Sequence, residues 1–436
     1  MWMLEMANIQ YPSWGNFPVE HTNGIFTQET TSDPIPKSKG KILARGQGRS
    51  YGDSCLNNNH SLLLTHHLNH IIDFDVSSGE ICCESGVTFE QLFALIIPQG
   101  WFAPVTPGTK FITVGGAVAN DVHGKNHHNA GTFGNYVKSL ELLRSDGERI
   151  TCAYDQDPDL LKATIGGLGL TGLILNVTFQ LKKIKSAWIE TEINCFKNLD
   201  EFSTLSQKRQ NDEYLVSWVD SLASGENLGR GVFISGKHTD SKTDYRKSSG
   251  LKLSVPFYFP SWTLNRYTVA AFNTLYFAIN KKHHGKHIKH YEPFFFPLDN
   301  IGNWNRIYGR RGFVQYQCVL PPDADHRSFL ETVSNSGFGS FLSVLKTFGD
   351  IPSEGLLSFP MPGITIALDF PVNRQLLSFL DELDTFVMAA SGRVYIAKDA
   401  RMSPEAFHAF YPQIEQFQSY LDPKFSSSFW RRVMED

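Results

Sequence analysis

Several features that would place a protein in a distinctive class are scarce or missing in this sequence. It has six cysteines and no Cys-x-x-Cys spacing. The adjacent Cys82 and Cys83 point to opposite faces of an expected strand, where they cannot readily share a tetrahedral metal site. Buried free thiols in a reducing compartment are therefore expected. The net charge is only -4, with 19% charged residues, so nucleic acid is not the expected partner.

Targeting segments, membrane spans and internal repeats are also missing. The N-terminal sequence MWMLEMANIQYPSWGN has no cationic start and no continuous apolar stretch, so we expect no secretory signal and a cytoplasmic protein. Residues 267–279 are apolar and aromatic. About 13 residues, however, reach only about 20 Å as a helix, which is too short for a bilayer core. We therefore expect no transmembrane span.

A cationic and histidine-rich segment, residues 281–290, directly follows that apolar stretch. One interpretation is a surface that rests on an anionic membrane, as a peripheral contact at its inner face, or that covers a lipid-like ligand. The other is a mobile loop with a solvated run of charge, and the sequence leaves both open. No acid or thiol completes a ligand set for the histidines, so we expect no metal.

What the chain does contain predicts a mixed architecture of two or three lobes, because 436 residues exceed what one core usually covers. Over roughly the first 185 residues, short β-rich runs such as 71–74 and 80–84 alternate with helical stretches. Thr88 opens one of these helices, and Gln91 completes a capping box. From about residue 187 the β-rich runs are longer, which predicts a second lobe.

Glycine-rich stretches raise the question of a phosphate-binding loop. The sequence GRSYGDSCLNNN, residues 48–59, is either a tight surface turn or a concavity of main-chain N–H groups that binds an anion beside Arg49. Residues 167–172 match G-x-G-x-x-G, but a helical run precedes them and a strand follows, the reverse of the dinucleotide-binding order, so we exclude a Rossmann fold. Residues 113–128 combine small side chains with ionisable ones.

Six blocks, taken together, resemble one family. They are ARGQGRSYGDSCLN (44–57), PGTKFITVGGAVANDVHGKNHHNAGTFGN (107–135), SLELLRSDGE (139–148), ATIGGLGLTGLIL (163–175), GFVQYQCVLP (312–321) and VYIAKDARM (394–402). The chain resembles the decaprenylphosphoryl-β-D-ribose 2-oxidases, which belong to the vanillyl-alcohol-oxidase class of flavoproteins. The resemblance implies an α+β fold with a PCMH-type FAD-binding domain (1–186 and 393–436). It also implies a substrate (cap) domain (187–392) with an antiparallel sheet and helices, and a lipid-facing or mobile segment near 251–291.

The resemblance also implies where FAD binds: residues 46–51 form the glycine-rich loop around its diphosphate. In relatives with covalently attached FAD, a histidine often stands where this chain has Arg49, and arginine cannot form that bond, so we expect non-covalent FAD. The expected cofactor-binding residues are Arg45, Gly46, Gln47, Gly48, Arg49, Ser50, Tyr51, Thr109, Thr113, Gly115, Gly116, Ala119, Asn120, His123, Gly124, Asn126, Gly169, Gly172, Tyr395 and Lys398.

Oxidation of an alcohol by a flavin needs hydride delivery to the ring and removal of the hydroxyl proton. By resemblance, Lys398 stabilises the developing negative charge, although a surface salt bridge with Asp399 is its alternative role. His123 is the candidate proton acceptor, with Lys398 and Lys346 as rivals. The expected substrate residues are Tyr51, His123, Lys125, Trp218, Tyr308, Gln315, Gln317, Lys346 and Asp369. Alternation along a strand places the two glutamines on one face and Tyr316 on the other.

The implied activity is FAD-dependent oxidation of the 2-hydroxyl of a polyprenyl-phosphate-linked pentose to a 2-keto sugar. A separate NAD(P)H-dependent short-chain reductase then completes the epimerisation. Two rivals stay open: a soluble aldonolactone or sugar-alcohol oxidase of the same fold, and a non-catalytic flavin-binding scaffold. Two departures matter. Ala367 stands where mycobacterial members have a cysteine, and residues 251–291 match the family poorly, so the lipid tail is open.

Overall fold

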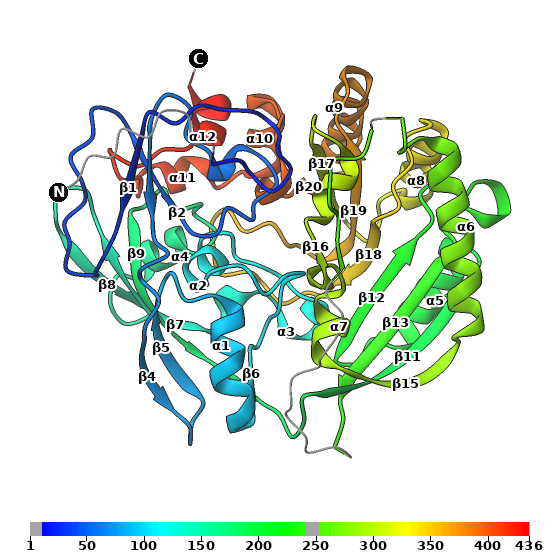
Figure 1. Ribbon diagram of the computed structural model, residues 1–436, viewed down its shortest axis with the longest axis horizontal. Coiled ribbons are helices and arrows are strands. Elements are labelled where there is room, and N and C mark those ends of the chain that lie inside the picture. Colours follow the sequence, from blue (N-terminus) through cyan, green and yellow to red (C-terminus); the bar gives the residue numbers. More distant parts are fainter. Residues whose placement is uncertain (1–10, 241–252, 261, 436) are drawn as a thin grey trace.

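The computed structural model describes residues 11–240, 253–260 and 262–435. Expectations that concern residues 1–10 of the N-terminal segment, or residues 251, 252 and 261 of the poorly matching segment, lie outside the described residues. Two lobes lie side by side in Figure 1. One holds strands from the first part of the chain together with the C-terminal helices, and the other is built on one large sheet. The expected α+β fold class is confirmed.

Two sheets form most of the first lobe. A three-stranded parallel sheet has the order β1-β3-β2, and a five-stranded antiparallel sheet has the order β4-β5-β9-β7-β8. A short ladder joins β6 to β10. The strands are β1 (Gly24–Thr27), β2 (Ile42–Arg45), β3 (Ser61–Leu64), β4 (Ile71–Asp75), β5 (Glu80–Glu84), β6 (Trp101–Phe102), β7 (Val137–Leu143), β8 (Arg149–Ala153), β9 (Leu173–Gln180) and β10 (Lys182–Lys183).

Helix α1 (Phe89–Ile96) forms where the local sequence predicts it. The Thr88 side chain accepts the Gln91 N–H at 3.2 Å, and the Gln91 side chain accepts the Thr88 N–H at 2.9 Å, so the expected capping box is present. Four apolar side chains, spaced three and four residues apart, are buried in the core beside the five-stranded sheet. A turn that closes at Gly100, with φ +80°, ends the helical segment.

The G-x-G-x-x-G stretch connects α4 (Pro158–Thr164) to β9, so a helix precedes it and a strand follows. This order excludes a Rossmann loop, as the sequence predicts. Gly169 has φ +73° and Gly172 has φ +140°, two conformations that side chains with a Cβ rarely adopt. The stretch is therefore a tight connection into β9.

One eight-stranded antiparallel sheet, in the order β15-β11-β13-β12-β18-β19-β17-β20, forms the second lobe. A small ladder pairs β14 with β16. The strands are β11 (Trp188–Phe196), β12 (Tyr214–Val219), β13 (Gly231–His238), β14 (Leu253–Ser254), β15 (Gly285–His290), β16 (Ile301–Gly302), β17 (Phe313–Leu320), β18 (Ser343–Phe348), β19 (Gly363–Pro371) and β20 (Arg393–Val394).

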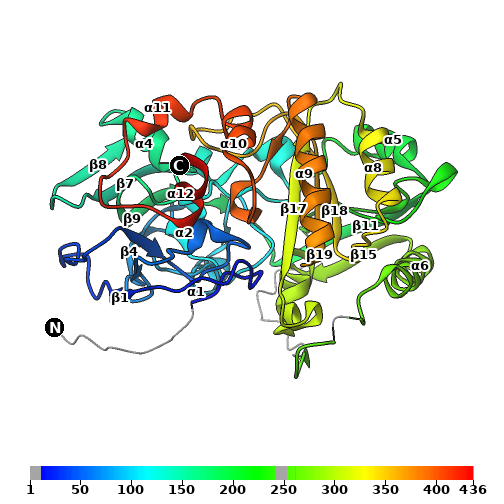
Figure 2. The same cartoon turned by 90° about the horizontal axis from the view of Figure 1, so that it is seen from above.

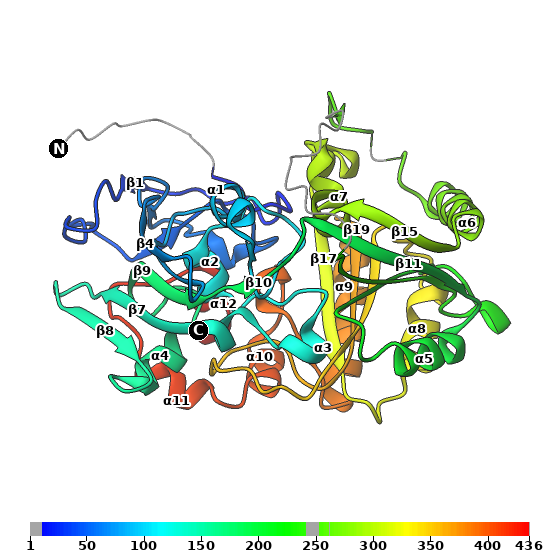
Figure 3. The same ribbon diagram turned by 90° about the horizontal axis from the view of Figure 1, so that it is seen from below.

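Helices cover the two faces of this sheet differently. Figure 3 shows α5 (Leu199–Lys208), α8 (His326–Asn335) and α9 (Arg374–Ala389) on one face, where their apolar side chains share a core with the sheet. Figure 2 shows α9 running along β17 and β19. Helix α6 (Arg266–Lys282) packs on the opposite face near β11 and β13, and α7 (Tyr291–Phe295) lies beside β11 and β15. The rest of that face turns toward the first lobe.

Two expectations from the sequence are corrected. The mobile-loop interpretation of residues 281–290 is wrong, because residues 285–290 form β15 and pair with β11 along its length. All six cysteines are free, but only Cys83, Cys152 and Cys318 are buried, and the other three are half-buried. In the described part of the chain, no helix combines the length and the apolar character that crossing a membrane requires.

The C-terminal segment returns to the first lobe after β20. Its helices are α10 (Pro404–Phe410), α11 (Ile414–Gln418) and α12 (Ser428–Met434), which lie beside the N-terminal strands in Figure 1. Ile42 N–H donates to the Lys424 carbonyl at 2.9 Å, and Ser426 N–H donates back to the Ile42 carbonyl at 3.0 Å. The short 3-10 helix Ile396–Lys398 therefore lies where the chain crosses from the large sheet to the first lobe.

Candidate active site

The loop after β2 presents a row of unpaired main-chain N–H groups. Among the residues that the structure describes, the N–H groups of residues 46–50 donate to no partner, whereas Tyr51 N–H donates to the Ala397 carbonyl at 2.9 Å. Gly48 has φ +60°, and a Cβ there would lie 2.1 Å from the Arg45 guanidinium. Arg45 in turn donates to two main-chain carbonyls, each at 2.7 Å, and so supports the loop.

The second wall of this site comes from α2 (Val114–Ala119), which Thr113 caps by accepting the Gly116 N–H at 3.1 Å. A Cβ on Gly46 would lie 2.5 Å from the Thr113 hydroxyl oxygen, so the two walls touch through glycine. A diphosphate needs several N–H donors and little side-chain bulk around it. The residues present therefore fit the diphosphate of FAD.

A half-buried lysine, Lys398, and a buried aspartate, Asp369, lie near this loop. Lys398 Nζ is 3.6 Å from the centroid of the Tyr51 ring. Asp369 accepts hydrogen bonds from the Gln315 amide at 2.5 Å and from the Tyr308 hydroxyl at 3.3 Å. Burial lowers the pKa of Lys398, which the nearby Asp369 carboxylate partly offsets, and burial raises the pKa of Asp369. Two groups with pKa values moved toward each other can hold or release a proton near neutral pH.

The glutamines of β17 divide between the faces as alternation predicts. Gln315 and Gln317 face the first lobe, whereas the Tyr316 hydroxyl donates to Asp384 of α9 at 2.9 Å on the other face. Asp369 is the cross-strand partner of Gln315, and Ala367 is that of Gln317. Adjacent strands thus build one polar wall.

His123 meets this wall from the first lobe. The side-chain amide nitrogen of Gln317 lies 3.0 Å from His123 Nε2 and 3.2 Å from the Thr365 hydroxyl oxygen. Burial lowers the pKa of His123 well below its ordinary value, and the charge of Lys346 lowers it further. The imidazole is therefore neutral at physiological pH, as a proton acceptor must be.

Two further half-buried lysines lie in the same region, without carboxylate partners among the described residues. Lys125 Nζ donates to the Phe295 carbonyl at 3.2 Å, and Lys346 Nζ lies 5.8 Å from the Phe348 ring. Burial lowers the pKa of Lys125 to about 8. Burial, with repulsion from Lys125 and Lys398, lowers the pKa of Lys346 to about 7. Neither amine pairs with a carboxylate anywhere in residues 11–240, 253–260 or 262–435, so both remain available to an anionic ligand.

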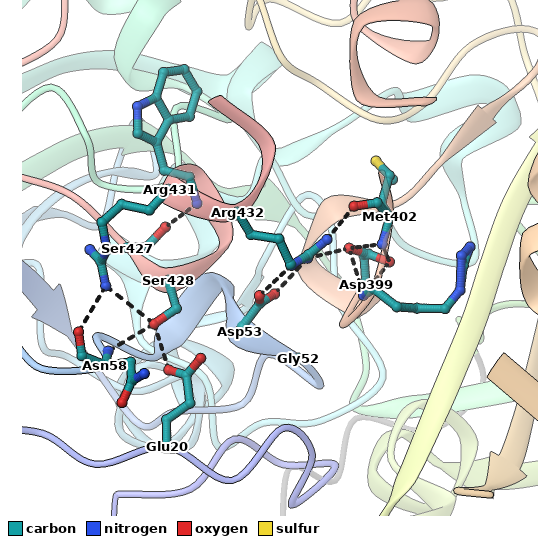
Figure 4. Close-up of polar contacts among 12 residues, drawn as sticks. Glu20, Gly52, Asp53, Asn58, Asp399, Met402, Ser427, Ser428, Arg431 and Arg432 are labelled. Atoms are coloured by element: carbon teal, nitrogen blue, oxygen red, sulfur yellow. Dashed lines mark hydrogen bonds and ion pairs between the residues drawn. The ribbon is translucent and has the colours of Figure 1, made fainter. Parts of the chain in front are cut away.

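An arginine of α12 joins two loops of the site, as Figure 4 shows. The Arg432 guanidinium donates to both carboxylate oxygens of Asp53, at 2.7 and 2.9 Å, and to Asp399 at 2.7 Å. Asp53 lies two residues after Tyr51, and Asp399 directly follows Lys398. One guanidinium thus ties together the loops that carry Tyr51 and Lys398.

The alternative role of Lys398, a surface salt bridge with Asp399, is wrong. Asp399 is buried and pairs with Arg432, while Lys398 turns toward Tyr51 and Asp369. Arg432, Asp53 and Asp399 were missed as site residues in the sequence, because Asp53 and Arg432 lie 379 positions apart and no motif links them.

Of the other expected residues, some lie near this cluster of side chains and some lie apart from it. The Tyr395 hydroxyl donates to the Asn120 carbonyl at 3.1 Å, and its ring lies 5.3 Å from that of His123. The Asn126 side chain donates to the Pro104 carbonyl at 2.8 Å. Trp218 lies apart: its ring is 4.7 Å from Tyr276 of α6, and its N–H donates to a carbonyl before β18 at 3.0 Å.

Comparison with known proteins identifies the family. Residues 33–153 match the FAD binding domain family. The chain is 37% identical over 410 residues to the decaprenylphosphoryl-β-D-ribose oxidase of Mycolicibacterium smegmatis, covering 90% of this chain and 89% of that protein. An uncharacterized protein of Streptomyces coelicolor is 32% identical over 372 residues, covering 80% of this chain and all of that protein. The human Delta(24)-sterol reductase is 24% identical over 193 residues, covering 43% and 36% of the two chains. The chain therefore belongs to the decaprenylphosphoryl-β-D-ribose oxidase family and is an FAD-dependent oxidoreductase.

Proposed function

We propose that this protein oxidises the 2-hydroxyl of a polyprenyl-phosphate-linked pentose to a 2-keto sugar. The observation that carries the proposal is the pair of half-buried lysines, Lys125 and Lys346, beside the polar wall of His123 and Gln317. A partly desolvated cation without a carboxylate partner is unfavourable unless a ligand supplies the negative charge. A sugar phosphodiester supplies it, and the hydroxyls of the sugar pair with the glutamine amides.

FAD binds non-covalently in this proposal, between residues 1–186 and 393–436, and the substrate binds over residues 187–392. The N–H groups of residues 46–50 hold the diphosphate. Arg49 cannot form a covalent bond to the flavin, and its guanidinium instead lies 4.4 Å from the Trp14 ring. Precipitation of the protein with acid should therefore release all of the flavin into the supernatant.

The chain's own groups perform the rest of the chemistry once FAD supplies an acceptor for the hydride of the carbinol carbon. Lys398 places a positive charge where negative charge develops. His123, neutral because burial lowers its pKa, accepts the hydroxyl proton at Nδ1, in the tautomer whose Nε2–H donates to the oxygen of the Gln317 amide. Tyr51 packs under Lys398 and fixes the direction of its amine.

The product of this step is a ketone that remains attached to a lipid phosphate. Its conversion to the epimeric alcohol requires a hydride donor, so we propose an NAD(P)H-dependent short-chain reductase as the next enzyme. A substrate with a polyprenyl tail resides in a bilayer, so we also propose peripheral contact with a membrane.

Anaerobic titration of the purified yellow protein tests the proposal. A polyprenyl-phosphoryl pentose should bleach the flavin absorbance, while the same pentose without the lipid phosphate should not. Equal bleaching by the free sugar would support a sugar-alcohol or aldonolactone oxidase instead. A spectrum that no sugar bleaches would support a flavin-binding scaffold. Lys346→Gln should weaken the response to the lipid-phosphate sugar and leave the absorbance of the bound flavin unchanged.

A further inference from the structure

Helix α6 has an outer face without charge. Residues 267–280, YTVAAFNTLYFAIN, contain no Asp, Glu, Lys or Arg. A surface helix of a soluble protein normally carries charged and polar side chains on its outer face. Here the large outward side chains are apolar or aromatic instead, beside the exposed Thr268 and Thr274: Tyr267 is 81% exposed, Leu275 60%, Ile279 45% and Phe272 43%, and Trp262, just before the helix, is 74% exposed.

The flanks of this helix are cationic. Arg266 begins α6, and Lys281 and Lys282 end it, followed by His283 and His284. Acidic residues number 44 in the whole chain, and the protein carries a net charge of -4, yet none lies between residues 253 and 291. The local sign is therefore opposite to that of the molecule as a whole. An apolar strip with cationic ends is complementary to an anionic lipid surface.

The inner side of α6 is fixed to the fold, so the exposed strip is not a frayed segment. Asn273 is fully buried, and its amide donates to Asp220 at 2.8 Å. Tyr276 packs against Trp218 of the sheet, with ring centroids 4.7 Å apart. A rigid helix of 17 residues, about 25 Å long, thus presents one apolar face outward.

A row of aromatic rings connects this helix to the candidate active site. The Phe272 ring lies 5.5 Å from that of Phe341, and the Phe341 ring lies 5.6 Å from that of Tyr308. The Tyr308 hydroxyl donates to Asp369 in the polar wall. Phe272 is itself 43% exposed, so the row runs from the outward face of α6 to the site.

We propose that α6 is the membrane-binding element of this protein and lies flat on an anionic lipid bilayer. Trp262, Tyr267, Leu275 and Ile279 enter the boundary between headgroups and acyl chains, and Lys281 and Lys282 pair with lipid phosphates. The inference rests on the proposed function in one respect, because a lipid-linked substrate gives this contact its use. The aromatic row is then the path along which the polyprenyl tail leaves the bilayer.

Vesicle sedimentation of the full-length, FAD-loaded protein tests this surface. Vesicles of phosphatidylcholine with phosphatidylglycerol, and vesicles of phosphatidylcholine alone, are compared at low and high salt. The wild type should bind the anionic vesicles. Leu275→Ser with Ile279→Ser should weaken binding about tenfold or more, because two inserted apolar side chains are lost. Lys281→Gln with Lys282→Gln should weaken binding to anionic vesicles by a similar factor, and high salt should mimic that change.

A matched variant controls for a general loss of exposed apolar surface. Ile72→Ser with Tyr154→Ser removes two side chains that are 53% and 47% exposed on the first lobe, and it should bind vesicles like the wild type. Absence of vesicle binding by the wild type, or equal loss in the two pairs of serine variants, overturns the inference. Vesicle binding without flavin bleaching would refute only the proposed oxidation, whereas bleaching by a short-tailed, micellar substrate without vesicle binding would refute only the role of α6.

Discussion

Replacing Arg432 with alanine separates the two loops of the site without touching either of their functional side chains. The guanidinium makes three N–H···O contacts to Asp53 and Asp399, and it also donates to the Met402 carbonyl. The loops approach so closely that a Cβ on Gly52 would lie 1.6 Å from the Asp399 carbonyl oxygen. We expect the variant to lose this register and, with it, the contact between Lys398 and Tyr51.

The size of the effect follows from burial. Asp53 is 2% exposed and Asp399 6%, so alanine leaves two buried carboxylates that repel each other. Loss of one partner from a buried ion pair costs about 3–5 kcal/mol, a large part of a typical unfolding free energy. Burial acts to raise the pKa of Asp399, but Arg432 and Arg401 hold it below its ordinary value. The stabilisation is therefore present above the unfolded pKa of about 4 and is lost as pH falls through the folded value.

Arg431 provides the matched control, because it is the preceding residue on the same helix. Its guanidinium donates to the Asn57 side chain at 2.8 Å and to the Asn58 carbonyl at 3.1 Å, away from Lys398. Chemical denaturation should show a larger loss of unfolding free energy for Arg432→Ala than for Arg431→Ala. In acid, the unfolding free energies of Arg432→Ala and the wild type should become equal. Stopped-flow flavin reduction should slow about 10- to 100-fold in Arg432→Ala and change little in Arg431→Ala.

Partial rescue distinguishes positioning from simple destabilisation. Arg432→Lys keeps the charge but cannot bridge two carboxylates with a planar fork, so its reduction rate should lie between those of the alanine variant and the wild type. Equal rates for Arg431→Ala and Arg432→Ala, or an Arg432→Ala protein that reduces its flavin at the normal rate, would refute the reasoning.

Two other predictions concern the half-buried lysines Lys346 and Lys398. The pKa of Lys346, lowered to about 7 by burial, means that the amine is charged below this pH and neutral above it, so KM for a lipid-phosphate substrate should rise by about tenfold per pH unit above about 7. Lys346→Arg should flatten that profile, because arginine stays charged; a wild-type KM that is constant between about pH 6 and pH 9 would contradict the phosphate contact. Lys398→Ala should retain or bind flavin poorly and reduce it about 100- to 1000-fold more slowly, measured by anaerobic stopped flow, and a normal rate would remove its electrostatic role.

The sequence predicts the features of this molecule that depend on near neighbours. The capping box at Thr88 and Gln91 is a contact over three residues, so the sequence alone predicts it. The polar face of β17 depends only on alternation, which places Gln315 and Gln317 together. The exclusion of a Rossmann loop likewise needed only the order of helix, glycines and strand.

The contacts that join the lobes could not be predicted in this way. Asp53 and Arg432 lie 379 residues apart, and Gln317 and His123 lie 194 apart, so no periodicity brings either pair together. The sequence also did not decide whether residues 281–290 form a mobile loop or a surface that contacts lipid, and it did not predict a strand, because a run of lysine and histidine does not resemble one. Pairing with β11 decides the matter, since a neighbouring strand supplies the hydrogen bonds that local propensity does not.

Charge relates the two ends of the proposed substrate path. Lys125, Lys346 and Lys398 are half-buried, and among the residues that the structure describes Asp369 is the one carboxylate whose charge acts on their pKa values. A neutral sugar would leave that excess of positive charge unpaired, at a cost that a lipid phosphate removes. A ligand with an apolar tail, one negative group and a polyhydroxyl head has three chemistries, and each has a counterpart in the described residues: the outer face of α6, the amines of Lys125 and Lys346, and the glutamine wall. A soluble sugar oxidase has no use for the first two, which is why this arrangement favours the lipid-linked substrate.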